Sequence, residues 1–322
     1  MARNSLFGPI DPAREAGYAD PPSRKGFFTD TSVCIGCKAC EVACKEWNLV
    51  PDEGYDLLGM SFDNTGALGA NTWRHVAFVE QPAGARSGGN RATVDLGMPA
   101  VRPPGGPGSD VGAPDGGQAE AGSSDGERPD FRWLMSSDVC KHCTHAACLD
   151  VCPTGSLFRT EFGTVVVQPD ICNGCGYCVP ACPYGVIERR KGPKGARNVG
   201  VAQKCTLCYD RLGAGMEPAC AKACPTDSIQ FGDVDELRER ARARAETLRG
   251  AGVSEARLYG DDPNDGVGGA GAFFLLLDEP EVYGLPPDPV VTTRDLPHMF
   301  NRATTAAVAL FLGAAAVFLG KR

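Results

Sequence analysis

The sixteen cysteines of this 322-residue chain form four groups of four, and no cysteine lies outside a group. Each group opens with two cysteines separated by two residues and closes with a cysteine four positions after its third. Thiolates bind soft metals and metal–sulfur clusters, so the pattern predicts sets of ligands. We name the groups motif I (Cys34, Cys37, Cys40, Cys44), motif II (Cys140, Cys143, Cys148, Cys152), motif III (Cys172, Cys175, Cys178, Cys182) and motif IV (Cys205, Cys208, Cys220, Cys224).

The spacing inside the motifs favours [4Fe–4S] clusters. Motifs I and III have the pattern C-x2-C-x2-C-x3-C, which bacterial ferredoxins use for these clusters. A proline follows the last cysteine of motifs II, III and IV, as in the ferredoxin pattern, whereas Lys45 follows motif I. A cubane takes four thiolates, so the sixteen cysteines fit four [4Fe–4S] clusters, with iron as the bound metal. The chain is therefore predicted to carry electrons.

Disulfide bonds and zinc binding are the two alternative roles for these cysteines. Disulfides are common in secreted chains, but residues 1–25 contain no apolar targeting segment, and a chain of this length needs no disulfides to fold. Zinc sites use C-x2-C pairs. Motif IV has eleven residues between Cys208 and Cys220, so by itself it would also be compatible with a zinc site. A zinc-binding scaffold remains a remote alternative, which iron and acid-labile sulfide analysis would test.

Motifs II and III are predicted to form one two-cluster ferredoxin-like module. Cys172 follows Cys152 by twenty residues, and between them 156–160 and 164–167 predict two short strands joined by a turn. In such modules the fourth cysteine of each run binds the other cluster. The expected ligand sets are cluster C (Cys140, Cys143, Cys148, Cys182) and cluster D (Cys152, Cys172, Cys175, Cys178).

Motifs I and IV then remain to pair with each other by the same crossing. The expected ligand sets are cluster A (Cys34, Cys37, Cys40, Cys224) and cluster B (Cys44, Cys205, Cys208, Cys220). The predicted fold is α+β, with two nested ferredoxin-like two-cluster modules. No catalytic residues are expected, because the chain has no nucleophile–base set, and its four histidines are too few and scattered for a second metal site.

The remaining segments predict strands and helices around these modules. Strands are expected at 26–30, 73–79, 131–135 and 272–277, and a helix at 233–249. Residues 81–130 are rich in Gly, Pro, Ala, Ser and Asp, which predicts a flexible insertion. The expected layout is an N-terminal arm (1–26), the motif I half of the outer module (27–80), the insertion (81–130), the inner module (131–200), the motif IV half of the outer module (201–232), a helix and strand segment (233–300) and an anchor (301–322).

Dinucleotide and nucleic-acid binding are both disfavoured by the sequence. Residues 266–271 match G-x-G-x-x-G, but they precede a predicted strand, whereas a dinucleotide-binding turn follows a strand and opens a helix. We therefore expect a glycine-rich loop there. The formal net charge of −8 argues against a nucleic-acid partner.

A membrane-spanning helix is expected near the C-terminus. Residues 303–320 carry no charge, and at about 1.5 Å per residue they reach roughly across a bilayer core. Ala309 and Gly313 would allow close approach of a second helix. The flanking positive charges are balanced, so the positive-inside rule does not choose a side. Because no export signal is seen, the cytoplasmic face is slightly favoured for the cluster domain over the outer face.

Four stretches of the chain resemble the iron–sulfur (beta) subunit of membrane-bound formate dehydrogenases. They are 34–48, with Glu46-Trp47-Asn48 after motif I, then 172–178, then 204–211, and finally 258–286, with its Gly-Val-Gly-Gly run. The cluster motifs alone are shared with the beta subunits of dimethyl sulfoxide, nitrate and polysulfide reductases and of some hydrogenases. The opening motif and the C-terminal stretch narrow the resemblance to formate dehydrogenase, and the insertion at 81–130 is a departure that leaves the cysteines untouched.

This resemblance implies a non-catalytic electron-transfer subunit of a larger complex. The implied partners are a molybdopterin (Mo or W) catalytic subunit and an integral membrane quinone-reactive subunit, of the cytochrome b or NrfD-like type. The same role in another molybdopterin oxidoreductase or in a hydrogenase is the alternative.

Overall fold

The computed structural model describes residues 11–52, 62–63, 65–82, 131–193, 197–291, 293 and 296–319. All sixteen cysteines lie in these ranges. The predicted insertion lies outside the described residues from position 83 to its end, so its flexibility stays a prediction. The chain divides into a large unit, Met1–Val79 with Leu134–Arg322, and a small unit, Glu80–Trp133.

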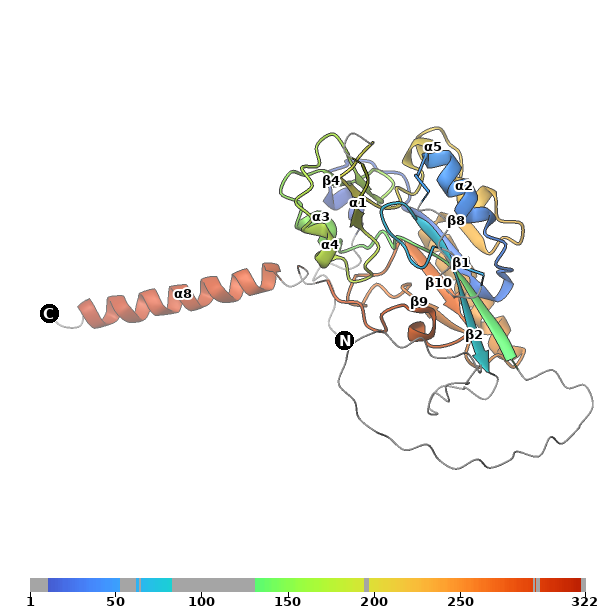
Figure 1. Ribbon diagram of the computed structural model, residues 1–322. Helices are drawn as coiled ribbons and strands as arrows, with labels where there is room; N and C mark the ends of the chain where they lie inside the picture. Colours follow the sequence, from blue (N-terminus) through green and yellow to red (C-terminus); the bar gives the residue numbers. More distant parts are fainter. Residues whose placement is uncertain are drawn as a thin grey trace, which may run out of the picture. The chain divides into compact units, whose positions relative to one another are not determined.

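A four-stranded mixed sheet lies at the centre of the large unit (Figure 1). Its strand order is β8 (Ile229–Asp233), β1 (Lys25–Asp30), β10 (Ala272–Leu276) and β9 (Arg257–Tyr259). β1 is antiparallel to β8 and parallel to β10, with Phe27 opposite Ala272. The predicted strands at 26–30 and 272–277 are therefore confirmed. β1 comes just before motif I and β8 just after motif IV, so the pairing of these two strands joins the two ends of the cysteine-containing region.

Alternate residues of β1 face two different cores, as the two-residue period of a strand requires. Phe28 packs with Phe273 and with α7 (Val234–Gly250), whose buried residues include Leu237, Ala241 and Ala245. This confirms the predicted helix and most of its apolar stripe. Phe27 instead packs in a core that contains cysteines of motifs I, II and IV. The sheet thus holds α7 on one face and the motifs on the other.

Short helices follow or contain the cysteines of every motif. α2 (Ala39–Asn48) carries Cys40 and Cys44, α3 (Ala147–Asp150) carries Cys148, α4 (Cys178–Ala181) begins at Cys178, and α6 (Ala219–Lys222) carries Cys220; α5 (Tyr209–Gly213) follows Cys208. α2 packs against α6, and α3 packs against α4. Helices of motifs I and IV are thus neighbours, as are those of motifs II and III.

In the described residues, three two-stranded sheets accompany the central sheet. β4 (Leu157–Arg159) and β5 (Val165–Val167) form the hairpin predicted between motifs II and III. β2 (Arg74–Pro82) pairs with β3 (Phe131–Val139), in agreement with the predicted strands at 73–79 and 131–135. β6 (Glu188–Arg189) pairs with β7 (Ala202–Gln203) just before motif IV. Single helical turns are α1 (Pro12–Glu15), η1 (Thr31–Val33) and η2 (Pro280–Tyr283).

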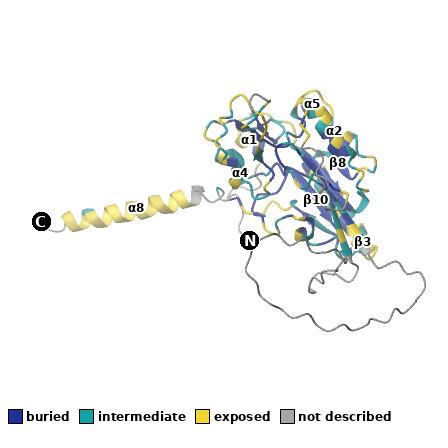
Figure 2. Cartoon of the chain, viewed as in Figure 1, coloured by how far each residue is buried: buried dark blue, intermediate teal, exposed yellow. Residues whose placement is uncertain are grey.

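The last helix, α8 (Leu296–Leu319), is apolar and exposed (Figure 2). Its segment Met299–Leu319 has a mean hydropathy of 1.8 and is long enough to cross a bilayer. Among its exposed side chains are Phe311 and Phe318, at 73% and 79% exposure. Such apolar exposure contrasts with the central sheet, whose β10 residues are all buried.

Candidate iron–sulfur cluster sites

The first three cysteines of motif II share a cavity with the last cysteine of motif III. Cys140, Cys143 and Cys148 line it together with Cys182. Burial raises the pKa of the Cys143 thiol well above its usual range, and the nearby Cys140, Cys148 and Cys182 raise it further. The four thiols predicted for cluster C therefore converge, although Cys182 is distant in sequence from the other three.

A second cavity brings together the first three cysteines of motif I and the last cysteine of motif IV. Cys34, Cys37 and Cys40 line it with Cys224, beside Ser137. Burial raises the pKa of Cys34, and Cys224 and Cys37 contribute to that rise. Burial also raises the pKa of Cys40 to about 11. These are the four thiols predicted for cluster A.

The last cysteine of motif I lies with the first three of motif IV. Burial raises the pKa of Cys44 well above its usual range, and the neighbouring Cys205, Cys220 and Cys208 add to the effect. The amide Nδ2 of Asn48 is 3.8 Å from the Sγ atoms of both Cys44 and Cys208. All four thiols are buried. They match the set predicted for cluster B.

The last cysteine of motif II lies near the first three of motif III. Burial raises the pKa of Cys178 to about 11, with further contributions from Cys172, Cys175 and Cys152. Cys152 behaves differently, because hydrogen bonds from backbone N–H groups and from the Thr154 hydroxyl outweigh its partial burial and lower its pKa. The set predicted for cluster D is as open as set A, since Cys175 is exposed and Cys172 and Cys152 are half-buried.

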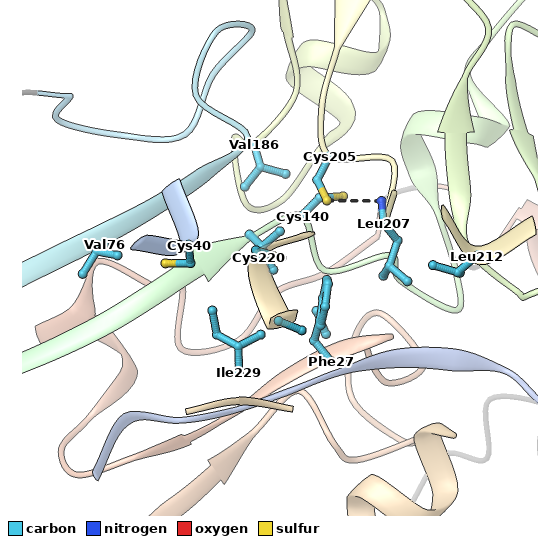
Figure 3. Close-up of a cluster of buried hydrophobic side chains, with 13 residues drawn as sticks. Phe27, Cys40, Val76, Cys140, Val186, Cys205, Leu207, Leu212, Cys220 and Ile229 are labelled. Atoms are coloured by element: carbon cyan, nitrogen blue, oxygen red, sulfur yellow. Dashed lines mark hydrogen bonds between the residues drawn. The ribbon is translucent and has the colours of Figure 1, made fainter. Parts of the chain in front are cut away.

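Left-handed backbone positions shape the turns between the paired cysteines. In motif IV, Leu207 and Cys208 have φ values of 56° and 48°, and the Leu207 N–H donates to Cys205 Sγ at 3.3 Å (Figure 3). Lys38 in motif I and His142 in motif II also have positive φ. This geometry turns backbone N–H groups toward the thiols, where they favour the thiolate form.

Residues that follow the cysteines directly in sequence connect motifs I and IV. Trp47 and Asn48 come after motif I, and Asp210 and Arg211 come after Cys208. Trp47 Nε1 donates to the Asp210 carboxylate at 2.8 Å, and the Arg211 guanidinium lies over the Trp47 ring at 4.2 Å. These residues hold α2 beside α5, so the two halves of the expected outer module are joined by side chains that are not ligands.

Buried cations surround the thiols, and this arrangement suits the binding of anionic clusters. Arg74, Lys141 and Lys204 are each no more than 2% exposed. Lys204 Nζ donates to the carbonyls of Val165 and Cys205, and Lys141 Nζ to the Asp138 carboxylate. A buried charge is costly unless a counter-charge is near. Four thiolates around a cubane would supply that counter-charge, so the donor set and its surroundings fit a [4Fe–4S] cluster.

The glycine-rich loop at 266–271 supports motif II, a role that the sequence did not predict. It contains no strand or helix, which agrees with the expected loop. Thr144 N–H donates to the carbonyl of Gly269, and His145 N–H to that of Val267. Gly268 has a φ of +76°, and a Cβ there would lie 2.5 Å from His145 Cδ2. Only glycine allows this close approach at positive φ.

The non-ligand residue that sequence reasoning missed is Arg74, at the start of β2. It lies far from the motifs in sequence, and a lone arginine before an apolar strand carries no signal of its own. Among residues 11–52, 62–63, 65–82 and the later described ranges, no group of three or more His, Cys, Asp or Glu side chains is arranged to hold a single metal ion.

Comparisons with known proteins identify the family and the class of cofactor. Residues 33–156 and 131–234 each match a family model described as a 4Fe–4S dicluster domain. The protein is 34% identical over 268 residues to the nitrate-inducible formate dehydrogenase iron–sulfur subunit of Escherichia coli, covering 82% of this chain and 73% of the relative. It is 32% identical over 296 residues to the formate dehydrogenase-O iron–sulfur subunit of the same organism, covering 91% and 80%. A subunit of the Escherichia coli anaerobic dimethyl sulfoxide reductase is 31% identical over 216 residues, covering 67% and 76%.

The matching segments and the paired cysteine motifs define a protein of the 4Fe–4S dicluster class. Within that class, the chain belongs to the family of formate dehydrogenase iron–sulfur subunits. The resemblance found in the sequence is therefore confirmed, as is the expectation of [4Fe–4S] cofactors and of an electron-transfer subunit without a catalytic centre of its own.

Proposed function

We propose that the chain relays electrons through four [4Fe–4S] clusters, between a molybdopterin catalytic subunit that acts on formate and a quinone-reactive membrane subunit. The observation that carries the proposal is the crossing of cysteines between motifs. Cys182 lies with Cys140, Cys143 and Cys148, and Cys224 lies with Cys34, Cys37 and Cys40. This is the exchange expected of two-cluster ferredoxin modules. It supports the ligand sets given above for clusters A, B, C and D.

Two nested modules would account for these neighbours. Helices and strands of motif I pair with those of motif IV, as α2 packs on α6 and β1 pairs with β8. Helices and strands of motifs II and III pair likewise, as α3 packs on α4 and β4 pairs with β5. The inner pair would thus be a second copy of the outer arrangement, inserted between its halves.

Thiols of successive sets also neighbour one another, which supports one continuous path. Cys40 of set A lies near Cys220 of set B, and Cys205 of set B lies near Cys140 of set C. Cys148 of set C lies near Cys178 of set D. The proposed order is therefore A, B, C, D. When bound, each cubane supplies a one-electron carrier, and this chain's buried side chains hold the carriers in order and exclude water between them.

The two ends of this path have the exposed thiols. Cys37 in set A and Cys175 in set D are exposed, whereas every thiol of set B is buried. Electrons would enter and leave at the ends, where partner subunits can approach. The proposed partners are the molybdopterin subunit and an integral membrane subunit of the cytochrome b or NrfD-like type.

Formate-dependent reduction tests this function. In the complex purified anaerobically with its partners, formate should reduce the clusters of this chain, as followed by electron paramagnetic resonance, and a quinone analogue should reoxidise them. The similarity to a dimethyl sulfoxide reductase subunit favours one alternative, the same role beside another molybdopterin enzyme or a hydrogenase. Clusters that formate does not reduce, but that dimethyl sulfoxide reoxidises, would support that alternative instead.

We further propose that α8 anchors the subunit in the membrane, with the cluster domain on the cytoplasmic face. The support is the length and apolar exposure of Met299–Leu319. Truncation after Pro297 should move the subunit, or its dimer with the catalytic partner, into the soluble fraction. Protease treatment of intact spheroplasts tests the side, since cleavage from outside would assign the cluster domain to the outer face.

A further inference from the structure

Arg74 is an arginine enclosed within the cysteine-containing core. Its side chain is 1% exposed, at the start of β2. Nη1 donates to both the carbonyl and the hydroxyl oxygen of Ser137, each at 3.2 Å. The guanidinium lies over the ring of Phe27, 4.8 Å from its centroid. Its position is therefore fixed by β1 on one side and by β3 on the other.

Within the described residues, the rest of this guanidinium lacks hydrogen-bond acceptors. Neither Nε nor Nη2 has a hydrogen-bond acceptor in the described part of the chain, and Arg74 forms no ion pair with a carboxylate there. A buried charge without a counter-charge costs several kcal/mol. Lys141 and Lys204, the other fully buried cations, are bound by a carboxylate and by carbonyl oxygens. In the described part of the chain, Arg74 thus has neither a carboxylate partner nor a full set of hydrogen-bond acceptors, so its counter-charge must come from elsewhere.

The groups around Arg74 are thiols from two different ligand sets. Ser137, its hydrogen-bond partner, also lies 3.2 Å from Cys40 Sγ, so one hydroxyl links the guanidinium to set A. Phe27, beneath the guanidinium, packs in the same core as Cys205 and Cys220 of set B (Figure 3).

The electrostatics agree with this placement. Burial alone would lower the pKa of Arg74, but Cys220, Cys40, Cys205 and Cys44 outweigh it and raise the pKa above its ordinary value. Three of these thiols belong to set B and one to set A.

We propose that Arg74 is a shared counter-charge between clusters A and B, which raises the reduction potential of both. This rests on the proposed ligand sets. Adding an electron makes a cluster more negative, and a fixed positive charge in a water-excluded core favours that reduced form. The guanidinium contacts residues that pack beside the thiols of sets A and B. This one side chain therefore raises the reduction potentials of both clusters. Arg74 is a positioning and tuning residue, and not a ligand.

The test is a redox titration of the intact complex carrying Arg74→Gln, followed by electron paramagnetic resonance. We expect the reduction equilibrium of clusters A and B to shift at least tenfold toward the oxidised form, which for one electron is about 59 mV. Clusters C and D should keep their potentials. Arg74→Lys, which keeps the charge, should leave the potentials of clusters A and B close to those of the unchanged protein.

Arg159→Gln is the matched control. Arg159 is a half-buried arginine whose guanidinium donates to the carbonyls of Cys143 and Thr144, beside set C. Removing it should shift cluster C and leave A and B unchanged. If Arg74→Gln shifts all four clusters alike, or shifts none while iron content is intact, the proposal is wrong.

A second variant keeps the test decisive if Arg74→Gln does not assemble. Ser137→Asp would place a carboxylate beside Arg74 Nη1 and neutralise the positive charge of the guanidinium without removing Arg74. Because this carboxylate would also lie beside Cys40 of set A, cluster B is the diagnostic one: a lowered B potential is expected, and an unchanged B potential would contradict the proposal. In either case, formate reduction of four clusters with unshifted potentials would retain the proposed function and remove only the role of Arg74.

Discussion

Motif IV and motif III differ in how deeply the fold encloses their cysteines. Cys205, Cys208 and Cys220 of motif IV are buried at 7%, 4% and 4% exposure, and Cys205 and Cys220 lie in a core with Phe27 of the central sheet. In motif III, Cys175 is exposed and Cys172 is half-buried. The difference teaches that the same kind of ligand serves two purposes. Deep thiols form part of the hydrophobic core, whereas in the proposed path shallow thiols would bring a cluster within reach of a partner.

Packing accounts for the difference. Motif IV is enclosed by α2, by the central sheet through β8, and by the Trp47–Asp210 hydrogen bond. Motif III begins in a turn that follows the small β4–β5 hairpin, and its exposed neighbours include Tyr177 at 62% exposure. Small two-stranded units bury little surface, so they cannot cover a cluster on all sides.

The largest expected effect is the contrast between Cys205→Ser and Cys175→Ser. Cys205→Ser replaces a proposed ligand of cluster B in the buried core that also contains cysteines of motifs I and II. Loss of this cluster would therefore remove packing around motifs I, II and IV. We expect loss of more than one cluster and a strong fall in soluble protein. Cys175→Ser should cost at most one cluster, about four iron atoms, and leave the fold in place. Iron analysis and circular dichroism of both variants check this, and equal losses would contradict the contrast.

Cys152→Ser sharpens the comparison by testing which cluster this cysteine serves. The proposed crossing assigns it to Cys172, Cys175 and Cys178, so the variant should perturb the signal of cluster D. The cluster held by Cys140 should keep its spectrum and potential. Electron paramagnetic resonance of the reduced variant makes the measurement. A perturbed Cys140 cluster with an intact cluster D would refute the crossing.

A smaller effect is expected from Gly268→Ala, in the loop that supports motif II. The new Cβ would meet His145, and the residue would be held at positive φ, so we expect a loss of about 1–3 kcal/mol of stability. Cluster C should become more labile to oxygen than cluster B.

Gly252→Ala is the control for that prediction. Gly252 also has a positive φ, of +92°, but nothing lies within 4 Å of its Cβ position. It should show only the cost of backbone strain, about 1 kcal/mol. Thermal unfolding of both variants separates the two costs, and an equal loss would mean that contact with His145 does not matter.

The cysteine motifs and the [4Fe–4S] class of their cofactor could be predicted from the sequence because motif spacing is local. Each C-x2-C turn and each closing cysteine is set by neighbouring residues, and the hairpin between motifs II and III follows from Thr164–Val167 and its turn. The helix α7 was predictable for the same reason, since its stripe of Leu237, Ala241 and Ala245 repeats with the helical period.

The remaining features depend on contacts between distant segments, which local patterns do not encode. Nothing near Phe27 indicates that it pairs in parallel with Ala272. Nothing near Arg74 indicates that it is enclosed by thiols, and the glycines at 266–271 give no sign that they support Thr144 and His145. Each of these features appears only when the motifs are assembled.

The most direct test of the account is the iron, acid-labile sulfide and zinc content of the full chain purified without oxygen. Sixteen thiolates in four cubane sites predict about sixteen iron and sixteen sulfide per chain, with visible absorbance that dithionite bleaches. Stoichiometric zinc without labile sulfide would contradict the account and identify the chain as a scaffold instead.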